Sequence, residues 1–218
     1  MPAYFTLTLD TTAPTGCSIA FQGGITITGT RAVNLVLAAT GATQMKIYGD
    51  IGAAAIPTAE GDATFESYAT SKSTSLTTGD GSKTVKAKFM DSVGNVSSEV
   101  TVTIALDTSA PVITITGPDV STVSEVAGFD TSIFSFSSDS AFVEYKVKAV
   151  PATSSDNSAG VLIPTTAGSI NTSNTGTFAA STPISVTLKA SDVKTASAGD
   201  GAKIIKVFAK DDAGNWSV

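Results

Sequence analysis

Two short motifs each occur twice in this chain, and their spacing constrains the fold more than any other feature. Residues 10–14 (DTTAP) return as DTSAP at 107–111, 97 residues later. A second pair, GDGSK and DSVGN within residues 79–95, returns as GDGAK and DDAGN within 199–215, 120 residues later. Self-similarity at such a spacing indicates tandem copies of one domain. The longer second spacing indicates an insertion in the second copy.

The repeat divides the 218 residues into two domains of roughly 100 residues each. We predict a first domain at 1–105 and a second at 106–218. The count from Lys46 to Lys83 is 37 residues, and the matching count from Lys146 to Lys203 is 57, so 57 − 37 leaves 20 extra residues in the second copy. We place them in the Ser/Thr-rich region 151–182, where residues 161–163 form the one candidate strand.

Short stretches in both copies alternate apolar and polar residues, whereas no stretch shows the 3.6-residue period of an amphipathic helix. In the first copy these stretches lie near residues 5–9, 25–28, 33–37, 45–47, 85–89 and 100–104. Turn-forming Gly, Asn and Asp separate them. The pattern predicts an all-β chain of two tandem immunoglobulin-like antiparallel β-sandwiches. In the second copy it directs four side chains inward: Phe134, Phe136, Tyr145 and Val147.

Composition excludes several classes of protein. The net charge is −6 and the lysines are scattered among acidic residues, so we expect no nucleic-acid partner. No run approaches the roughly 18 apolar residues of a membrane span, so we expect no membrane insertion. The first ten residues lack the basic and apolar regions of a secretory signal. Cys17 is the single cysteine and is expected to be a small buried residue on the first strand.

The repeated Asp-x-x-Gly-Asn motif has two interpretations. An Asp at its first position can accept hydrogen bonds from nearby backbone amides, while Gly and Asn tolerate positive φ, so the motif is typical of a turn. The alternative is a calcium site built from the carboxylates of Asp10, Asp91, Asp107 and Asp211. Calcium needs six to eight oxygen ligands, and no single loop offers such a series. The turn is the favoured interpretation, and the sequence leaves calcium open.

An enzyme is the least supported class. The chain has no histidine, which removes the commonest general base and metal ligand, and Cys17 has no evident activating partner. Two carboxylate pairs, Glu60 with Asp62 and Asp211 with Asp212, fall in predicted loops, where solvated acids are ordinary. We therefore predict no catalytic, cofactor-binding or metal-binding residues.

Binding to a cell-surface polysaccharide is a second possibility. Sugar sites on β-sandwiches use exposed aromatic rings beside polar groups. The candidates, which do not cluster in the sequence, are Tyr4, Tyr48, Tyr68, Phe178 and Trp216. We expect Trp216 to pack in the core or at its rim. The inserted loop, at about residues 157–182, is a candidate contact surface for a host glycan.

The paired motifs resemble the immunoglobulin-like or fibronectin-III-like repeats of bacteria and bacteriophages. Such repeats begin with Asp-Thr-Thr-Ala-Pro and end with a Gly-Asp-Gly-x-Lys strand that leads to Asp-x-x-Gly-Asn. The resemblance implies a non-enzymatic spacer, found in surface adhesins, secreted hydrolases and phage particles; fold alone does not select among them. We expect a structural or decoration protein of a tailed phage virion, exposed on the capsid, neck or tail and bound to other virion proteins. A repeat fragment of a bacterial cell-surface adhesin or carbohydrate-binding protein is the alternative.

The closing strand raises one further question. The first copy finishes with VTVTIALD at 100–107, whereas the second reaches residue 218 without an equivalent. The first residues, YFTLTLD at 4–10, look like that same strand. Either the sequence is one stretch of a longer repeat protein, or the amino-terminal strand of one subunit completes the second domain of another. The second interpretation predicts an oligomer with head-to-tail contacts.

Overall fold

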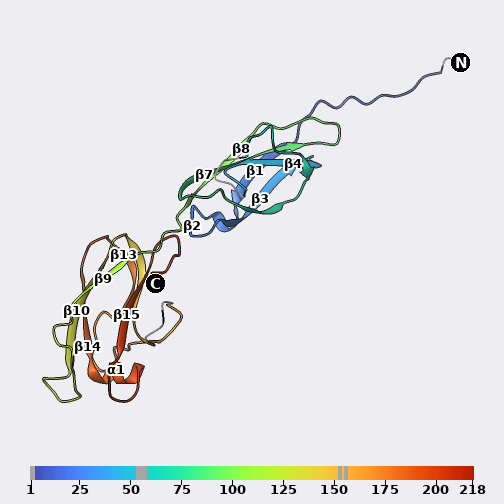
Figure 1. Cartoon of the computed structure of the whole chain (residues 1–218). Helices are drawn as coiled ribbons and strands as arrows, with labels where there is room; N and C mark the ends of the chain where they lie inside the picture. The colour runs from blue at the N-terminus through green and yellow to red at the C-terminus, as the bar shows by residue number, and fades with distance from the viewer. Residues whose placement is uncertain (1–2, 53–57, 152–153, 155–156) are drawn as a thin grey trace. The chain divides into compact units, whose positions relative to one another are not determined.

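The computed structural model describes residues 3–52, 58–151, 154 and 157–218 of the chain. They divide into two compact units, Met1–Thr108 and Ser109–Val218 (Figure 1). The regular structure of each unit is almost wholly strands, nearly all paired antiparallel and arranged in two sheets, which confirms the predicted all-β, immunoglobulin-like class. No helix among the described residues is long and apolar enough to cross a membrane.

In the first unit a three-stranded sheet packs against a five-stranded one. The smaller sheet has the order β1-β3-β6, formed by β1 (Thr15–Phe21), β3 (Ala32–Thr40) and β6 (Ser71–Ser75). The larger has the order β2-β8-β7-β4-β5, formed by β2 (Ile27–Thr28), β8 (Val100–Leu106), β7 (Gly81–Met90), β4 (Gln44–Gly49) and β5 (Glu66–Ser67). A short 3₁₀ turn, η1 (Gln22–Gly24), follows β1.

The second unit repeats this plan with one strand fewer among its described residues. Its smaller sheet has the order β14-β10-β9, formed by β14 (Ile184–Lys189), β10 (Thr131–Ser138) and β9 (Ile113–Thr116). In the other sheet β11 (Phe142–Val150) pairs with β15 (Ile204–Lys210), β12 (Val161–Leu162) and β13 (Ser173–Phe178). A helix of one to two turns, α1 (Ala190–Ala196), precedes β15.

Strand register shows how closely the two units correspond. In the first unit Gln44 lies opposite Met90, and in the second Glu144 lies opposite Lys210. Gln44 and Glu144 are 100 residues apart in the sequence, and Met90 and Lys210 are 120 apart, as the sequence repeat requires. The lysine of each GDGxK motif also behaves alike, since its Nζ donates to a carbonyl five residues earlier. The repeat in the sequence is therefore a repeat of backbone pairing.

Each unit has its own core, formed by the inward-facing residues of its two sheets. Leu35 and Leu37 are buried in the first, and their counterparts Phe134 and Phe136 are buried in the second, as predicted. Tyr145 and Val147 are also buried, as predicted. The second core is more aromatic: its rings include a stacked pair, Phe142 and Phe178, with centroids 4.8 Å apart. Such ring pairs add to the stabilisation from burial alone.

The predicted insertion is only partly correct. Residues 152–153 and 155–156 lie outside the described residues. Elsewhere the region holds β12, as predicted, but also β13, whose SNTGTF sequence is exposed along most of its length. Its ladder partner is β11. Apolar alternation could not reveal β13, because Phe178 at its end is its one apolar residue and the rest of the strand is exposed.

The strand register also shows that the 20 extra residues of the second copy lie in two places. Lys72 of β6 lies opposite Leu35, and Val186 of β14 lies opposite Phe134, so β6 and β14 are 114 residues apart. Because β4 and β11 are 100 apart and β7 and β15 are 120 apart, 14 extra residues precede β14 and six follow it. Those six lie where α1 forms, beyond the predicted region 151–182. A helix of seven residues is too short to show helical periodicity.

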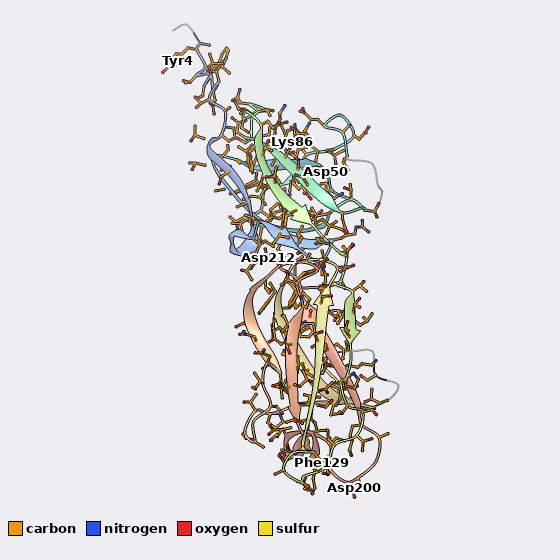
Figure 2. The ribbon with its side chains drawn as sticks, turned by 90° about the vertical axis from the view of Figure 1, so that its left-hand side faces the viewer. Tyr4, Asp50, Lys86, Phe129, Asp200 and Asp212 are labelled. Atoms are coloured by element: carbon orange, nitrogen blue, oxygen red, sulfur yellow. The ribbon has the colours of Figure 1, made fainter. Side chains whose placement is uncertain are left out.

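The predicted strand at residues 5–9 is wrong for this structure. The segment is not a strand, and its apolar side chains are exposed. It leads away from the sheets of the first unit (Figures 1 and 2, Tyr4). A closing strand needs the free edge of β7, and β8 already pairs with that edge from Gly81 to Ala87.

Candidate functional site

The two Asp-x-x-Gly-Asn motifs form the same closed turn. Asp91 Oδ1 accepts the backbone amide of Asn95 at 2.8 Å, and Oδ2 accepts the Asn95 side chain at 2.8 Å. Asp211 accepts the corresponding bonds from Asn215 at 2.8 and 2.9 Å. Burial acts to raise the pKa of Asp91, but the hydrogen bonds from Asn95 and its neighbours outweigh it and hold the pKa below its ordinary value. These carboxylates stabilise the turn between two strands.

The four carboxylates considered for calcium do not form a cluster. Asp10 Oδ1 accepts the Thr12 amide at 2.9 Å, and its backbone carbonyl accepts from Asn95 at 3.3 Å. Within residues 3–52, 58–151, 154 and 157–218, no three His, Cys, Asp or Glu side chains lie close enough together to hold a metal ion. Cys17 lies on β1 half-buried rather than buried, with Sγ 3.4 Å from the carbonyl of Pro14.

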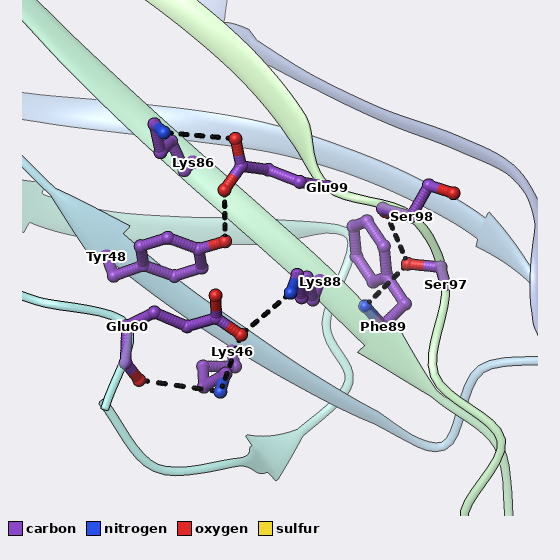
Figure 3. A network of polar contacts seen from close by, with 9 residues as sticks. All are labelled: Lys46, Tyr48, Glu60, Lys86, Lys88, Phe89, Ser97, Ser98 and Glu99. Atoms are coloured by element: carbon purple, nitrogen blue, oxygen red, sulfur yellow. Dashed lines mark hydrogen bonds and ion pairs between the residues drawn. The ribbon is translucent and has the colours of Figure 1, made fainter. Parts of the chain in front are cut away.

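A network of charged side chains covers the exposed face of the larger sheet in the first unit (Figure 3). Glu60 Oε1 lies 3.3 Å from the Nζ of Lys46 and 2.8 Å from that of Lys88. Glu99 accepts the hydroxyl of Tyr48 at 2.5 Å and forms an ion pair with Lys86 at 3.0 Å. The alternation of β4 and β7 places these lysines on one face of the sheet.

Each carboxylate of this network is stabilised in its charged form. The hydrogen bond from Lys88 lowers the pKa of Glu60, and those from Tyr48 and Lys86 lower the pKa of Glu99. Burial, followed by the contact with Glu99, raises the pKa of Tyr48. The lowered pKa values follow from these charge pairs, which link neighbouring strands of the sheet. Asp62, the second acid of the Glu60 pair, is exposed in a turn.

A smaller charged cluster lies on the equivalent face of the second unit. Glu144 forms ion pairs with Lys146 at 2.8 Å and with Lys210 at 2.5 Å. The ring of Trp216 lies beside both lysines, with its centroid 4.5 Å from Lys146 Nζ and 5.3 Å from Lys210 Nζ. The two lysines lower the pKa of Glu144. Asp212 is exposed on the neighbouring turn (Figure 2).

The five aromatic candidates for sugar binding are not brought together on one surface. The Tyr48 side chain is buried, and its hydroxyl donates a hydrogen bond to Glu99. The Tyr68 hydroxyl accepts the amide of Ala39, and its ring packs edge-on against Phe89. Phe178 stacks in the second core, Trp216 packs between lysines at the rim, and Tyr4 alone is fully exposed.

The inserted region is fixed by an aspartate that sequence reasoning did not single out. Asp192 of α1 is fully buried, and it accepts the amides of Ala167 and Ser169, each at 2.9 Å, and the Thr166 hydroxyl at 3.1 Å. Burial acts to raise its pKa, but the amides and hydroxyls around it hold that pKa below its ordinary value. The loop at 166–169 is thereby attached to the helix.

A concave feature of the second unit is lined by both core and loop residues. It is a cavity of about 940 Å³ at the end of the sandwich where β15 begins. Core side chains form its floor, including Phe134, Leu188 and Ile205. One wall is the stretch 120–125 and the other is the GDGAK loop at 199–203. Sequence reasoning did not predict this cavity.

Comparisons with known proteins return structural likeness only. No protein-family profile matches the chain, and no curated protein matches it in sequence. Among solved structures, the fibronectin(III)-like modules of CbhA from Clostridium thermocellum are 13% identical with a TM-score of 0.47; the match covers 92% of this chain and 89% of that one.

Two further solved structures give similar results. A 1.5-MDa bacterial ice-binding adhesin is 16% identical with a TM-score of 0.42, covering 95% of this chain and 62% of that one. The D00-D0 domain of intimin is 16% identical with a TM-score of 0.34, covering 93% and 92%. At such low identities and TM-scores, we base the immunoglobulin-like fold on the strand order and register of the chain itself.

Proposed function

We propose that this chain is a passive, non-enzymatic structural module: tandem immunoglobulin-like sandwiches that hold surfaces in place within a larger assembly. The observation that carries the proposal is the use made of its polar side chains. The acids at the turns, Asp91 and Asp211, secure strand connections, and Asp192 secures a loop. Glu60 and Glu99 neutralise lysines across strands. These groups are committed to maintaining shape.

The assembly that we propose is a tailed phage virion, in which the chain is a structural or decoration protein of the capsid, neck or tail. The sequence motifs support this location through their resemblance to phage immunoglobulin-like repeats. The same motifs support a bacterial surface adhesin, which is the competing assignment. Partners are then other virion proteins in the first case, and host cell-surface glycans or neighbouring repeats in the second.

Mass spectrometry of purified source material separates these assignments. We expect peptides spanning both units in density-purified phage particles, at a constant ratio to the major capsid protein through repeated purification. Peptides confined to the cell-envelope fraction would instead assign the chain to an adhesin. Recovery from neither particles nor envelopes would contradict a structural role at a surface. A cytoplasmic protein of the source serves as the contamination control in both fractions.

A further inference from the structure

The first unit holds the chain that leaves it beyond the end of its last strand. β8 ends at Leu106, and the amide of Asp107 then donates to the carbonyl of Thr28 at 3.0 Å. The amide and the hydroxyl of Thr108 both donate to Asp80 Oδ1, at 2.9 and 2.8 Å. The backbone is therefore fixed to the first unit through residue 108.

The second unit holds the chain from the point where it enters. The amide of Val112 donates to Asp139 Oδ1 at 2.8 Å, and the amide of Asp139 donates to the carbonyl of Val112 at 3.1 Å. Strand β9 begins at the next residue, Ile113. Pro111 is buried, as is Pro14 at the same place in the first copy. The backbone is thus fixed to the second unit from residue 112 onwards.

The linker between these two anchors is three residues long, Ser109–Pro111. Three residues span at most about 11 Å when fully extended. The ring of Pro111 fixes its own φ angle and restricts the backbone of Ala110 before it. Few dihedral angles therefore remain through which one unit could turn against the other.

The first anchor joins two of the repeated motifs. Thr108 is the second residue of DTSAP, and Asp80 is the acid of the first GDG sequence. In the first copy the DTTAP motif is also held locally: Asp10 Oδ1 accepts the amide of Thr12 at 2.9 Å, and the Asp10 carbonyl accepts the side chain of Asn95 at 3.3 Å. The motifs thus share a task, which is to fix the segments that connect consecutive domains.

The two anchors differ in strength. A hydrogen bond to an ionised carboxylate is stronger than one between neutral groups, but Asp80 and Asp139 are both exposed, so water competes for them. The Asp80 side chain accepts two bonds from Thr108. The contact of Asp139 with Val112 uses its side chain for one bond and its own amide for the other, so half of it survives loss of the carboxylate.

We propose that Asp80 and Asp139 anchor the two ends of the linker and thereby prevent the tandem units from moving independently. The inference rests on the proposed structural function, because a module that holds surfaces in place needs a stiff connection between its parts. It assigns that stiffness to two exposed carboxylates and a three-residue linker. Asp80 is the principal anchor.

Backbone amide relaxation, measured by NMR on the 218-residue chain, tests the proposal. We expect order parameters of about 0.85 for residues 108–110 and one rotational correlation time shared by both units. Asp80→Ala should lower those order parameters below about 0.6 and shorten the correlation times of both units. Asp80→Asn keeps an acceptor oxygen and should behave nearly as the parent does. Asp62→Ala removes an exposed acid elsewhere in the first unit and is the matched control.

Three further variants separate the anchors from the length of the linker. Thr108→Val removes the hydroxyl bond and keeps the amide bond, so its loss of order should be smaller than that of Asp80→Ala. Asp139→Ala should also have a smaller effect, since its amide still donates to Val112. A Gly-Gly-Ser insertion after Ser109 should leave residue 108 ordered and yet shorten both correlation times. Hydrogen exchange checks that every variant keeps both units folded.

Three results would overturn the proposal: parent units that tumble as independently as those of the insertion variant, parent-like order parameters in Asp80→Ala, or an equal loss of order in Asp62→Ala. If Asp80→Ala fails to fold, Thr108→Val decides in its place. Failure here is separable from failure of the proposed function, because a protein with a mobile linker recovered from particles or envelopes would still be a structural module.

Discussion

The two units share a strand order and a register, yet among the described residues β8 pairs with the second edge of β7, whereas no strand pairs with the corresponding edge of β15. In the first, β8 covers the core between β2 and β7. In the second, the same position is a cavity floored by Phe134, Leu188 and Ile205. A single strand thus decides whether one end of an otherwise equivalent core is sealed. The comparison also shows that a core can stay ordered elsewhere, since Phe142 and Tyr145 pack fully at the other end.

The largest loss of stability is expected for a substitution in β8, the closing strand of the first unit. Leu106→Ala should destabilise that unit by about 2–5 kcal/mol, because it leaves a cavity in a closed core. Residue-resolved hydrogen exchange should show the loss in the first unit and none in the second. The control is Leu9→Ala, at the corresponding repeat position, which should leave both units unchanged because Leu9 is exposed.

Asp192→Ala should cause the next largest loss of stability, and it should destabilise the second unit only. Removing the buried carboxylate leaves two backbone amides of the 166–169 loop without their acceptor, at a cost of about 3 kcal/mol. Exposed Asp212→Ala is the matched control and should have no measurable effect. Equal destabilisation by the two variants in urea unfolding would contradict the structural role assigned to Asp192.

Replacing the Asp of either Asp-x-x-Gly-Asn turn should destabilise its unit by a similar amount, which directly tests whether the two units are equivalent. Asp91→Ala should lower the melting temperature of the first unit, and Asp211→Ala that of the second, by similar amounts of several degrees. Each removes the acceptor of an Asn amide and an Asn side chain. Asn at either position is the conservative control. A calcium-dependent melting temperature in the parent that either variant abolishes would revive the metal interpretation.

The smallest effect should be that of pH across the neutral range. The chain has no histidine, so stability should be flat between about pH 5 and 8. The folded pKa values of Glu60, Glu99, Glu144 and Asp192 lie below their ordinary values. Their contribution is therefore present above the unfolded values of about 4 and is lost as the pH falls through the folded ones. Thermal melts from pH 8 to 2 check this, and a transition near pH 6 would contradict it.

Much of the fold could be predicted because its information is local or repeated. Alternation marks strands that have one buried face, such as β3 and β7, and the repeat transfers their assignment to β10 and β15. By contrast, β13 has a single apolar residue, Phe178, and α1 is shorter than the window over which a helical period can be recognised. Both depend on tertiary contacts: the pairing of β13 with β11, and the burial of Asp192.

The candidate site was less accessible to prediction. The closing-strand motif at residues 4–10 was visible, but its side chains could be assigned to the surface only once β8 was seen to pair with the edge of β7. The aromatic candidates were misleading, because a Tyr or Trp in an alternating stretch has the same signature whether other side chains cover it, as Glu99 and its neighbours cover Tyr48, or it lies at the rim, as Trp216 does.

The direction in which the chain runs through the first unit has a mechanical consequence. Its chain enters at Thr15, opposite Thr40, and leaves at Leu106, opposite Gly81, at the other end of the sandwich. Tension applied through the neighbouring segments would pull β1 and β8 along their own axes in opposite directions. The ladder hydrogen bonds run across the strands, so they would bear the load together rather than open one after another.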